Sequence, residues 1–172
     1  VAYLKGHGIA RDTRKAVRWF QMAAKSGHRL AEALVAYQAG TFDTAVALWK
    51  DEAQRGTSDA QYALGLVLLK GQGVRSNPKQ SLQWFGVAAK AGNTAAMFNL
   101  GGMYWEGIGT TADPSMAVYW WNRAAEKRDP ASQFNLGLAY YFGRGVPRNP
   151  AQATFWIQMR IVRVHKTFRR GP

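Results

Sequence analysis

Hydrophobic positions recur along the chain at a fixed step of 36 residues. A Leu-Gly pair and a tryptophan mark three copies, at Leu64, Gly65 and Trp84, at Leu100, Gly101 and Trp120, and at Leu136, Gly137 and Trp156. Ala60, Leu64 and Leu68 have the spacing of one helix face, and Leu82, Phe85 and Ala89 have that of a second helix. Two helices in each copy of a fixed period predict a stacked array of helical repeats.

A loop with two glycines separates the two predicted helices of each copy. The glycines are Gly71 and Gly73, Gly107 and Gly109, and Gly143 and Gly145. The first glycine follows a helix, where a positive φ closes the last turn without a steric cost. Each loop ends in Asn-Pro or Asp-Pro, which predicts an N-cap side chain followed by proline at the first helical position. No strand and no Gly-Lys-Ser/Thr ending accompany these loops, so we interpret them as structural turns and not as phosphate sites.

The rest of the chain is predicted to form less regular repeats. Residues 1–28 read as a partial repeat with its second helix over 13–26. Residues 29–57 lack the glycine loop and read as a short repeat, with helices over 30–38 and 43–55 joined by a turn at Gly40. The full repeats are 58–93, 94–129 and 130–160, and residues 161–172 are predicted to be a basic C-terminal tail.

The full copies resemble the Sel-one-like repeat (SLR) family, a branch of the tetratricopeptide superfamily. Residues 60–92 and 96–126 closely follow its pattern, in which A-x-x-x-L-G-x-x-Y-x-x-G-x-G-V precedes Asp or Asn and then A-x-x-W-(F/Y)-x-x-A-A. Leu68, Thr110 and Arg128 depart from the pattern, which ends after Trp156. The resemblance implies an all-α fold, an α/α right-handed superhelix (solenoid) of helix-turn-helix repeats. It also implies a scaffold for other proteins, as in bacterial envelope, virulence or signalling assemblies and in eukaryotic protein quality control.

Composition removes several classes of function. The chain has no cysteine, which excludes disulfides, thiol catalysis and cysteine-ligated metal. Its apolar runs are far shorter than the roughly 18 residues that a transmembrane helix needs, so we expect a soluble chain without such a helix. The chain begins at Val1 without an initiator methionine, so a preceding signal peptide or further repeats stay open and the compartment is undetermined.

Catalytic and metal-binding constellations are not apparent. His7, His28 and His165 have no Asp, Glu or Ser at a spacing that suggests a triad or a metal site. Asp51 and Glu52 are the only adjacent acids, and neighbours on a helix do not share a face. We therefore predict a non-catalytic protein that needs no cofactor and no metal.

The first helix of each repeat carries the predicted binding site. In tetratricopeptide-like arrays this helix lines the concave surface, and the matching positions here are Tyr62 and Leu66, then Phe98, Asn99, Trp105 and Glu106, then Phe134, Asn135, Tyr141 and Phe142. Aromatic side chains would supply apolar contacts, and the asparagine amides would pair with the backbone of an extended peptide. In the alternative interpretation, the aromatics pack against neighbouring repeats and the asparagines bond their own backbone.

Charge suggests a second hypothesis. The net charge of +13 lies at the ends, because residues 1–30 hold seven basic residues against one acid and residues 131–172 hold seven against none. An anion-binding module for nucleic acid or membrane headgroups is the alternative function. Its candidate residues are Arg11, Arg14, Lys15, Arg18, Arg160, Arg163, Lys166, Arg169 and Arg170. The basic ends would also favour an acidic protein partner, and an uncapped array end would allow self-association.

Overall fold

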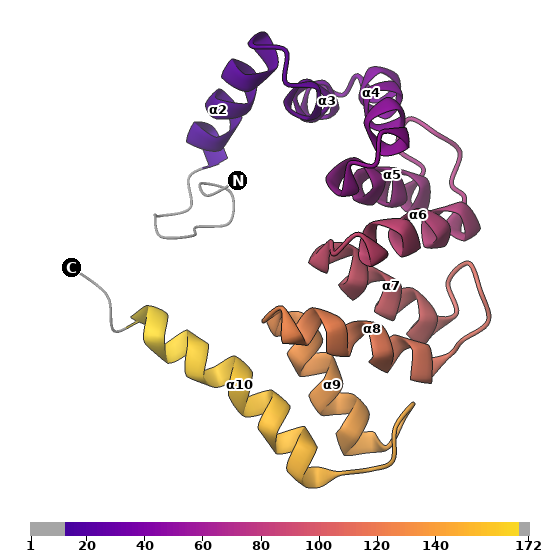
Figure 1. Ribbon diagram of the computed structural model, residues 1–172, viewed down its shortest axis with the longest axis vertical. Coiled ribbons are helices and arrows are strands. Elements are labelled where there is room, and N and C mark those ends of the chain that lie inside the picture. The colour runs from indigo at the N-terminus through magenta and orange to yellow at the C-terminus, as the bar shows by residue number, and fades with distance from the viewer. Residues whose placement is uncertain (1–12, 169–172) are drawn as a thin grey trace. The chain divides into compact units, whose positions relative to one another are not determined.

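The computed structural model describes residues 13–168, with side chains for 15–159, and these residues form nine helices and no strand (Figure 1). The predicted all-α fold is confirmed. The chain divides into two compact parts, Val1–Ser76 and Asn77–Pro172. We keep the numbering of Figure 1, in which the first labelled helix is α2.

The N-terminal part contains α2 (Thr13–Lys25), α3 (Arg29–Gln38), α4 (Phe42–Gln54) and α5 (Ser58–Lys70). Each helix packs against the next one in the sequence. The short connection between α3 and α4 is made by a turn in which Gly40 has a φ of 78°, as the missing glycine loop predicts. Tyr37 joins the two helices, because its ring centroid lies 5.2 Å from that of Phe42 and 5.3 Å from that of Trp49.

The C-terminal part contains α6 (Pro78–Lys90), α7 (Thr94–Glu106), α8 (Pro114–Glu126), α9 (Pro130–Phe142) and α10 (Pro150–Phe168). In Figure 1, α7 and α8 lie side by side, joined by the loop that holds Gly107 and Gly109. A core cluster comes from α8 and α9, with Ala117, Val118, Trp121, Ala125, Leu136 and Ala139. The backbone of α10 continues to Phe168, so residues 161–168, predicted to lie in a basic tail, extend the last helix.

Helix ends in the full repeats follow the predicted chemistry. The first loop glycines, Gly71, Gly107 and Gly143, are left-handed with φ of 71°, 73° and 68°. The side chains of Asn77, Asp113 and Asn149 accept hydrogen bonds from the backbone N–H groups three residues later, at 3.1, 3.0 and 3.1 Å. Asn93 and Asp129 cap α7 and α9 in the same way, and these two caps were not predicted from the sequence.

Removing the cap of α8 is expected to destabilise the protein modestly. Asp113→Ala loses the hydrogen bond from the Met116 N–H and should lower the free energy of unfolding by about 1 kcal/mol. Asp113→Asn keeps a capping oxygen, as at Asn77 and Asn149, and should stay within a few tenths of a kcal/mol of wild type. Urea denaturation followed by circular dichroism measures both, and an equal loss in the two variants would contradict the capping role.

The second glycine of each loop has a role that depends on the neighbouring repeat. A Cβ at Gly73 would lie 2.5 Å from Phe42 Cβ, and one at Gly109 would lie 2.5 Å from the Pro78 carbonyl oxygen. Gly145 meets the backbone of Pro114 in the same way. Phe42, Pro78 and Pro114 are the first residues of α4, α6 and α8, so each loop rests on the helix start of the repeat before it. The second glycine therefore permits the backbone contact by which successive repeats stack.

Arg128 shows that the closing position of a repeat does not need glycine. Gly27, Gly56 and Gly92 have φ between 79° and 91°, and Arg128 takes the corresponding place with a φ of 64°. Among the described residues, it is the one non-glycine with a positive φ. Added Cβ atoms at Gly27 and Gly56 would meet nothing within 4 Å. The closing turn thus has space for a side chain, although a non-glycine residue costs free energy in the left-handed backbone conformation.

Candidate functional site

The predicted binding residues of the C-terminal part lie on α7 and α9, and we call the surface they form the first-helix face. It consists of Phe98, Asn99, Trp105, Glu106, Phe134, Asn135, Tyr141 and Phe142. Tyr141 and Phe142 are 52% and 69% exposed, and Glu106 is also exposed. The other five side chains are half-buried. This surface therefore combines exposed aromatic area with aromatics that are partly packed.

Phe98 and Trp105 contribute to the core as well as to the surface. Both pack against the core cluster of α8 and α9. The Trp105 and Trp121 ring centroids are 5.2 Å apart, and Trp121 Nε1 donates to the Phe98 carbonyl oxygen at 3.2 Å. These contacts agree with the alternative interpretation, in which the aromatic side chains pack against neighbouring repeats. Both rings are only half-buried, so part of each also remains exposed.

One asparagine of this face is bonded to its own helix. Asn99 Nδ2 donates to the Ala95 carbonyl oxygen at 2.9 Å, one helical turn earlier. Asn135 has the equivalent position on α9 and is half-buried. The bond from Asn99 to Ala95 uses one of the two N–H groups of Nδ2.

The two predicted residues of the N-terminal part, Tyr62 and Leu66, lie half-buried on α5. The N-terminal part also contains a hydrogen bond that was not predicted from the sequence. The Tyr37 hydroxyl donates to Gln72 Oε1 at 2.6 Å, which ties α3 to the middle residue of the next glycine loop.

An arginine covers one end of the first-helix face. The Arg144 guanidinium carbon lies 4.1 Å from the centroid of the Trp105 ring, and Arg144 Nη2 donates to the Trp105 carbonyl oxygen at 2.9 Å. Arg148 Nε donates to the Tyr141 carbonyl oxygen at 3.2 Å. Neither arginine was predicted from the sequence to belong to the binding surface. The available signal was that arginine, and not a neutral residue, occupies the variable middle position of this glycine loop.

The anion-binding residues fall largely outside the described side chains. Lys15 and Arg18 lie exposed on α2. Arg11, Arg169 and Arg170 lie outside the described residues, and the side chains of Arg14, Arg160, Arg163 and Lys166 are also outside them. The alternative function therefore stays a sequence-based prediction.

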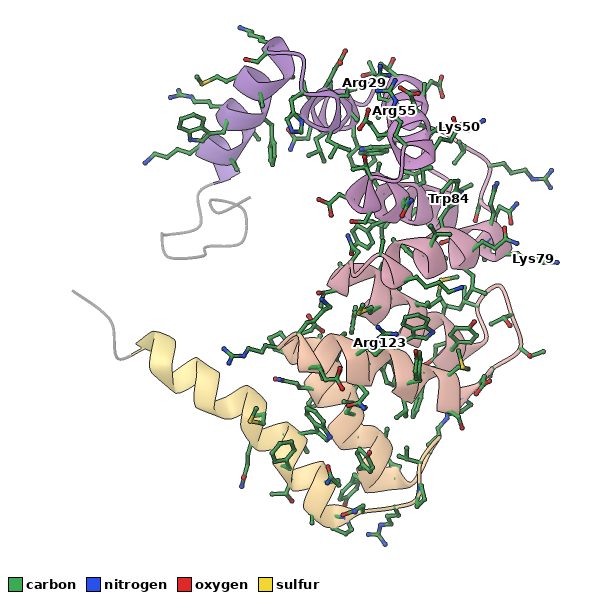
Figure 2. All side chains as sticks on the ribbon, in the orientation of Figure 1. Arg29, Lys50, Arg55, Lys79, Trp84 and Arg123 are labelled. Atoms are coloured by element: carbon green, nitrogen blue, oxygen red, sulfur yellow. The ribbon has the colours of Figure 1, made fainter. Side chains whose placement is uncertain are left out.

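The acidic pair Asp51 and Glu52 forms a surface ion-pair network. Arg29 approaches both carboxylates from α3, and Arg55 lies 3.2 Å from Asp51 and 3.3 Å from Glu52. Figure 2 shows Arg29 and Arg55 close together at α3 and α4. These acids are engaged in structural ion pairs. Among the described side chains of residues 15–159, no group of three or more His, Asp or Glu is arranged to hold a metal ion. No helix within residues 13–168 is long and apolar enough to cross a membrane.

Four segments of the chain match the Sel1 repeat, at residues 1–28, 58–93, 94–129 and 130–159. They cover more than half of the sequence. Residues 29–57, which form the shorter α3–α4 pair, lie outside the matches.

Two solved structures resemble this chain over 94% of its length. A protective antigen present in uropathogenic Escherichia coli strains, which displays an SLR fold, is 33% identical with a TM-score of 0.74. This chain spans 36% of that antigen. A Sel1 repeat protein from Oxalobacter formigenes is 28% identical with a TM-score of 0.73, and the match covers 69% of it. These similarities confirm the predicted solenoid of helical repeats.

Proposed function

Because the chain belongs to the Sel1 repeat family, whose members are generally non-catalytic protein–protein interaction scaffolds, we propose that it binds an extended segment of a partner protein on the first-helix face. Phe98, Trp105 and Phe134 supply the half-buried base of this surface, and Tyr141 and Phe142 supply its exposed aromatic area. In the N-terminal part, Tyr62 and Leu66 take the corresponding positions on α5.

The observation that carries the proposal is the exposure of Tyr141 and Phe142. Two adjacent aromatic side chains, 52% and 69% exposed with ring centroids 5.0 Å apart, end a helix whose other apolar residues are mostly covered. Aromatic residues bury large areas with few rotatable bonds and dominate the energy of protein interfaces. An exposed pair on a repeat helix is therefore a suitable anchor for a partner.

Asn99 and Asn135 would fix the main chain of the bound segment. An amide side chain presents a donor and an acceptor, which match one peptide group whatever side chain that residue carries. Asn99 already donates one amide N–H to the Ala95 carbonyl oxygen, so a bound peptide group would pair with the other N–H and with Oδ1. The net free energy of each such hydrogen bond is small, and the aromatic contacts carry most of the affinity.

Removing the exposed anchor is expected to weaken peptide binding at least tenfold. Displayed random peptides of about 16 residues are selected on the wild-type chain, and the affinity of the best peptide is measured by fluorescence anisotropy. Tyr141→Ala/Phe142→Ala deletes two exposed rings, each worth about 1 to 2 kcal/mol as an interface anchor. Their exposure means that the fold should survive, which circular dichroism checks.

A matched control is available on the second helices. Tyr119 on α8 and Phe155 on α10 are 47% and 49% exposed, and they lie outside the first-helix face. Tyr119→Ala/Phe155→Ala should leave the affinity within about twofold of wild type. Equal losses in the two double variants, or unchanged binding in both, would sink the proposed location. Selection of no peptide at all would sink the proposed function.

A further inference from the structure

Arg144 is held in place by the first-helix face. Its guanidinium stacks on Trp105 at 4.1 Å, and Nη2 is committed to the Trp105 carbonyl oxygen. Arg148 is fixed at Nε by the Tyr141 carbonyl oxygen. A side chain that is already ordered loses less conformational entropy when it binds a ligand. The two arginines are therefore preorganised, although both are exposed to solvent.

Neither arginine is neutralised by a described carboxylate. Within residues 15–159, Arg29 and Arg55 form ion pairs with Asp51 and Glu52, all in the N-terminal part. A guanidinium has five N–H donors, and Arg144 uses one nitrogen for Trp105. Nη2 carries two N–H groups and the bond to Trp105 uses one of them, so one of the two guanidinium forks, Nε with Nη2 or Nη1 with Nη2, keeps both of its donors, and a carboxylate fits that fork with two hydrogen bonds.

The aromatic side chains around Arg144 favour a ligand that has an apolar group as well as a negative charge. Trp105 lies beneath Arg144, and Tyr141 with Phe142 ends the neighbouring helix α9. Glu106 is the one acid of the first-helix face, so the two arginines leave a local excess of positive charge. An acidic residue beside an aromatic or aliphatic one would satisfy both the charge and the exposed rings.

We infer that Arg144, supported by Trp105 and Arg148, is a subsite for an Asp or Glu side chain of the partner, and that the residue next to this acid contacts Tyr141 and Phe142. The inference rests on the proposed function and specifies the partner's chemistry. It adds two residues, Arg144 and Arg148, to the binding surface.

The test compares peptides selected on the wild type with those selected on Arg144→Gln. Wild-type selections should be enriched in Asp or Glu next to an aromatic or aliphatic residue, and Arg144→Gln should lose the enrichment. For the best acidic peptide, Arg144→Gln should weaken binding about fivefold, a modest factor because the arginine is exposed. Arg144→Lys should recover only part of the loss, because lysine keeps the charge without the planar fork.

Two further variants separate charge recognition from a general effect on the fold. Arg123→Gln removes an arginine that also lies over aromatic rings, 5.8 Å from the Tyr119 centroid, but on the second helix α8; Figure 2 shows it there. It should leave the affinity unchanged. Glu106→Gln removes the repelling acid and should strengthen binding of the acidic peptide about twofold. Raising salt from about 50 to 300 mM should weaken wild-type binding more than that of Arg144→Gln.

The outcomes are distinguishable. Peptides that depend on Tyr141 and Phe142 but show no acidic preference, or bind Arg144→Gln as well as wild type, would overturn this inference and leave the proposed function standing. Absence of any selected peptide would overturn both. If the acid is recognised only as a free C-terminal carboxylate, amidating the terminus of the selected peptide abolishes binding, and the assignment to a side chain is overturned.

Discussion

Gly145→Ala is expected to lower the free energy of unfolding by about 3 to 4 kcal/mol, because two independent costs meet at one residue. The φ of Gly145 is 79°, and an L side chain in this conformation costs about 1 to 2 kcal/mol. The added Cβ would also lie 2.5 Å from the Pro114 carbonyl carbon. This neighbour is backbone at the start of α8 and cannot rotate away, so overpacking adds about 1 to 3 kcal/mol.

Gly92→Ala isolates the first of these costs. Gly92 lies in the same part of the chain with a φ of 91°, but the nearest atom to an added Cβ is Lys127 Nζ at 3.9 Å. This variant should lose about 1 kcal/mol. Urea unfolding, followed by both circular dichroism and tryptophan fluorescence, measures the difference and tests two-state behaviour, which repeat arrays can lose. If the free energy of unfolding falls equally in the two variants, the contact between the second loop glycine and the preceding repeat does not contribute to stability.

Gly101→Ala and Gly102→Ala are expected to change stability in opposite directions, although the residues are adjacent on α7. A Cβ at Gly101 would lie 2.5 Å from Trp121 Cδ1, in the core cluster. Displacing this indole also endangers the Trp121 Nε1 bond to the Phe98 carbonyl oxygen. The expected loss is about 2 to 4 kcal/mol from overpacking and the broken hydrogen bond.

At Gly102, an added methyl group meets nothing within 4 Å. Alanine has a higher helix propensity than glycine, so Gly102→Ala should gain up to about 1 kcal/mol. Thermal and urea unfolding of both single variants provides the comparison. In a Trp121→Leu background, adding Gly101→Ala should raise the free energy of unfolding above that of Trp121→Leu alone. The smaller leucine leaves space that the added methyl group can fill. Destabilisation by both glycine replacements would show that packing against Trp121 is not what requires Gly101.

Local sequence was sufficient for the helix boundaries of the full repeats. The first loop glycines take the left-handed conformation, and Asn77, Asp113 and Asn149 cap the helices that follow. Both features depend on atoms within a few residues, so residue type and spacing are enough to predict them. The same holds for the buried face of α5, where Ala60, Leu64 and Leu68 are 0%, 4% and 8% exposed.

The candidate site was predictable only as a set of helix positions. Helical periodicity places Phe98, Trp105, Phe134 and Tyr141 on one face, but it does not tell how much of each ring the neighbouring repeat covers. The structure leaves Tyr141 exposed and packs Phe98 and Trp105 against the α8–α9 core. Arg144 was missed because it acts on a residue 39 positions earlier, through a loop whose direction depends on repeat stacking.

The sequence by itself determined the repeat period, the helices and the caps that follow the glycine loops, because these follow from side-chain periodicity and from hydrogen bonds between near neighbours. Only the tertiary structure determines that the second loop glycine has no space for a Cβ. It also determines that Gly101, and not the adjacent Gly102, lies against Trp121. It also placed Arg144 over Trp105. These features depend on how closely the backbone and rings of different helices and loops approach one another. Such a steric contact cannot be predicted from the local sequence of either partner alone, because it depends on how the two segments pack.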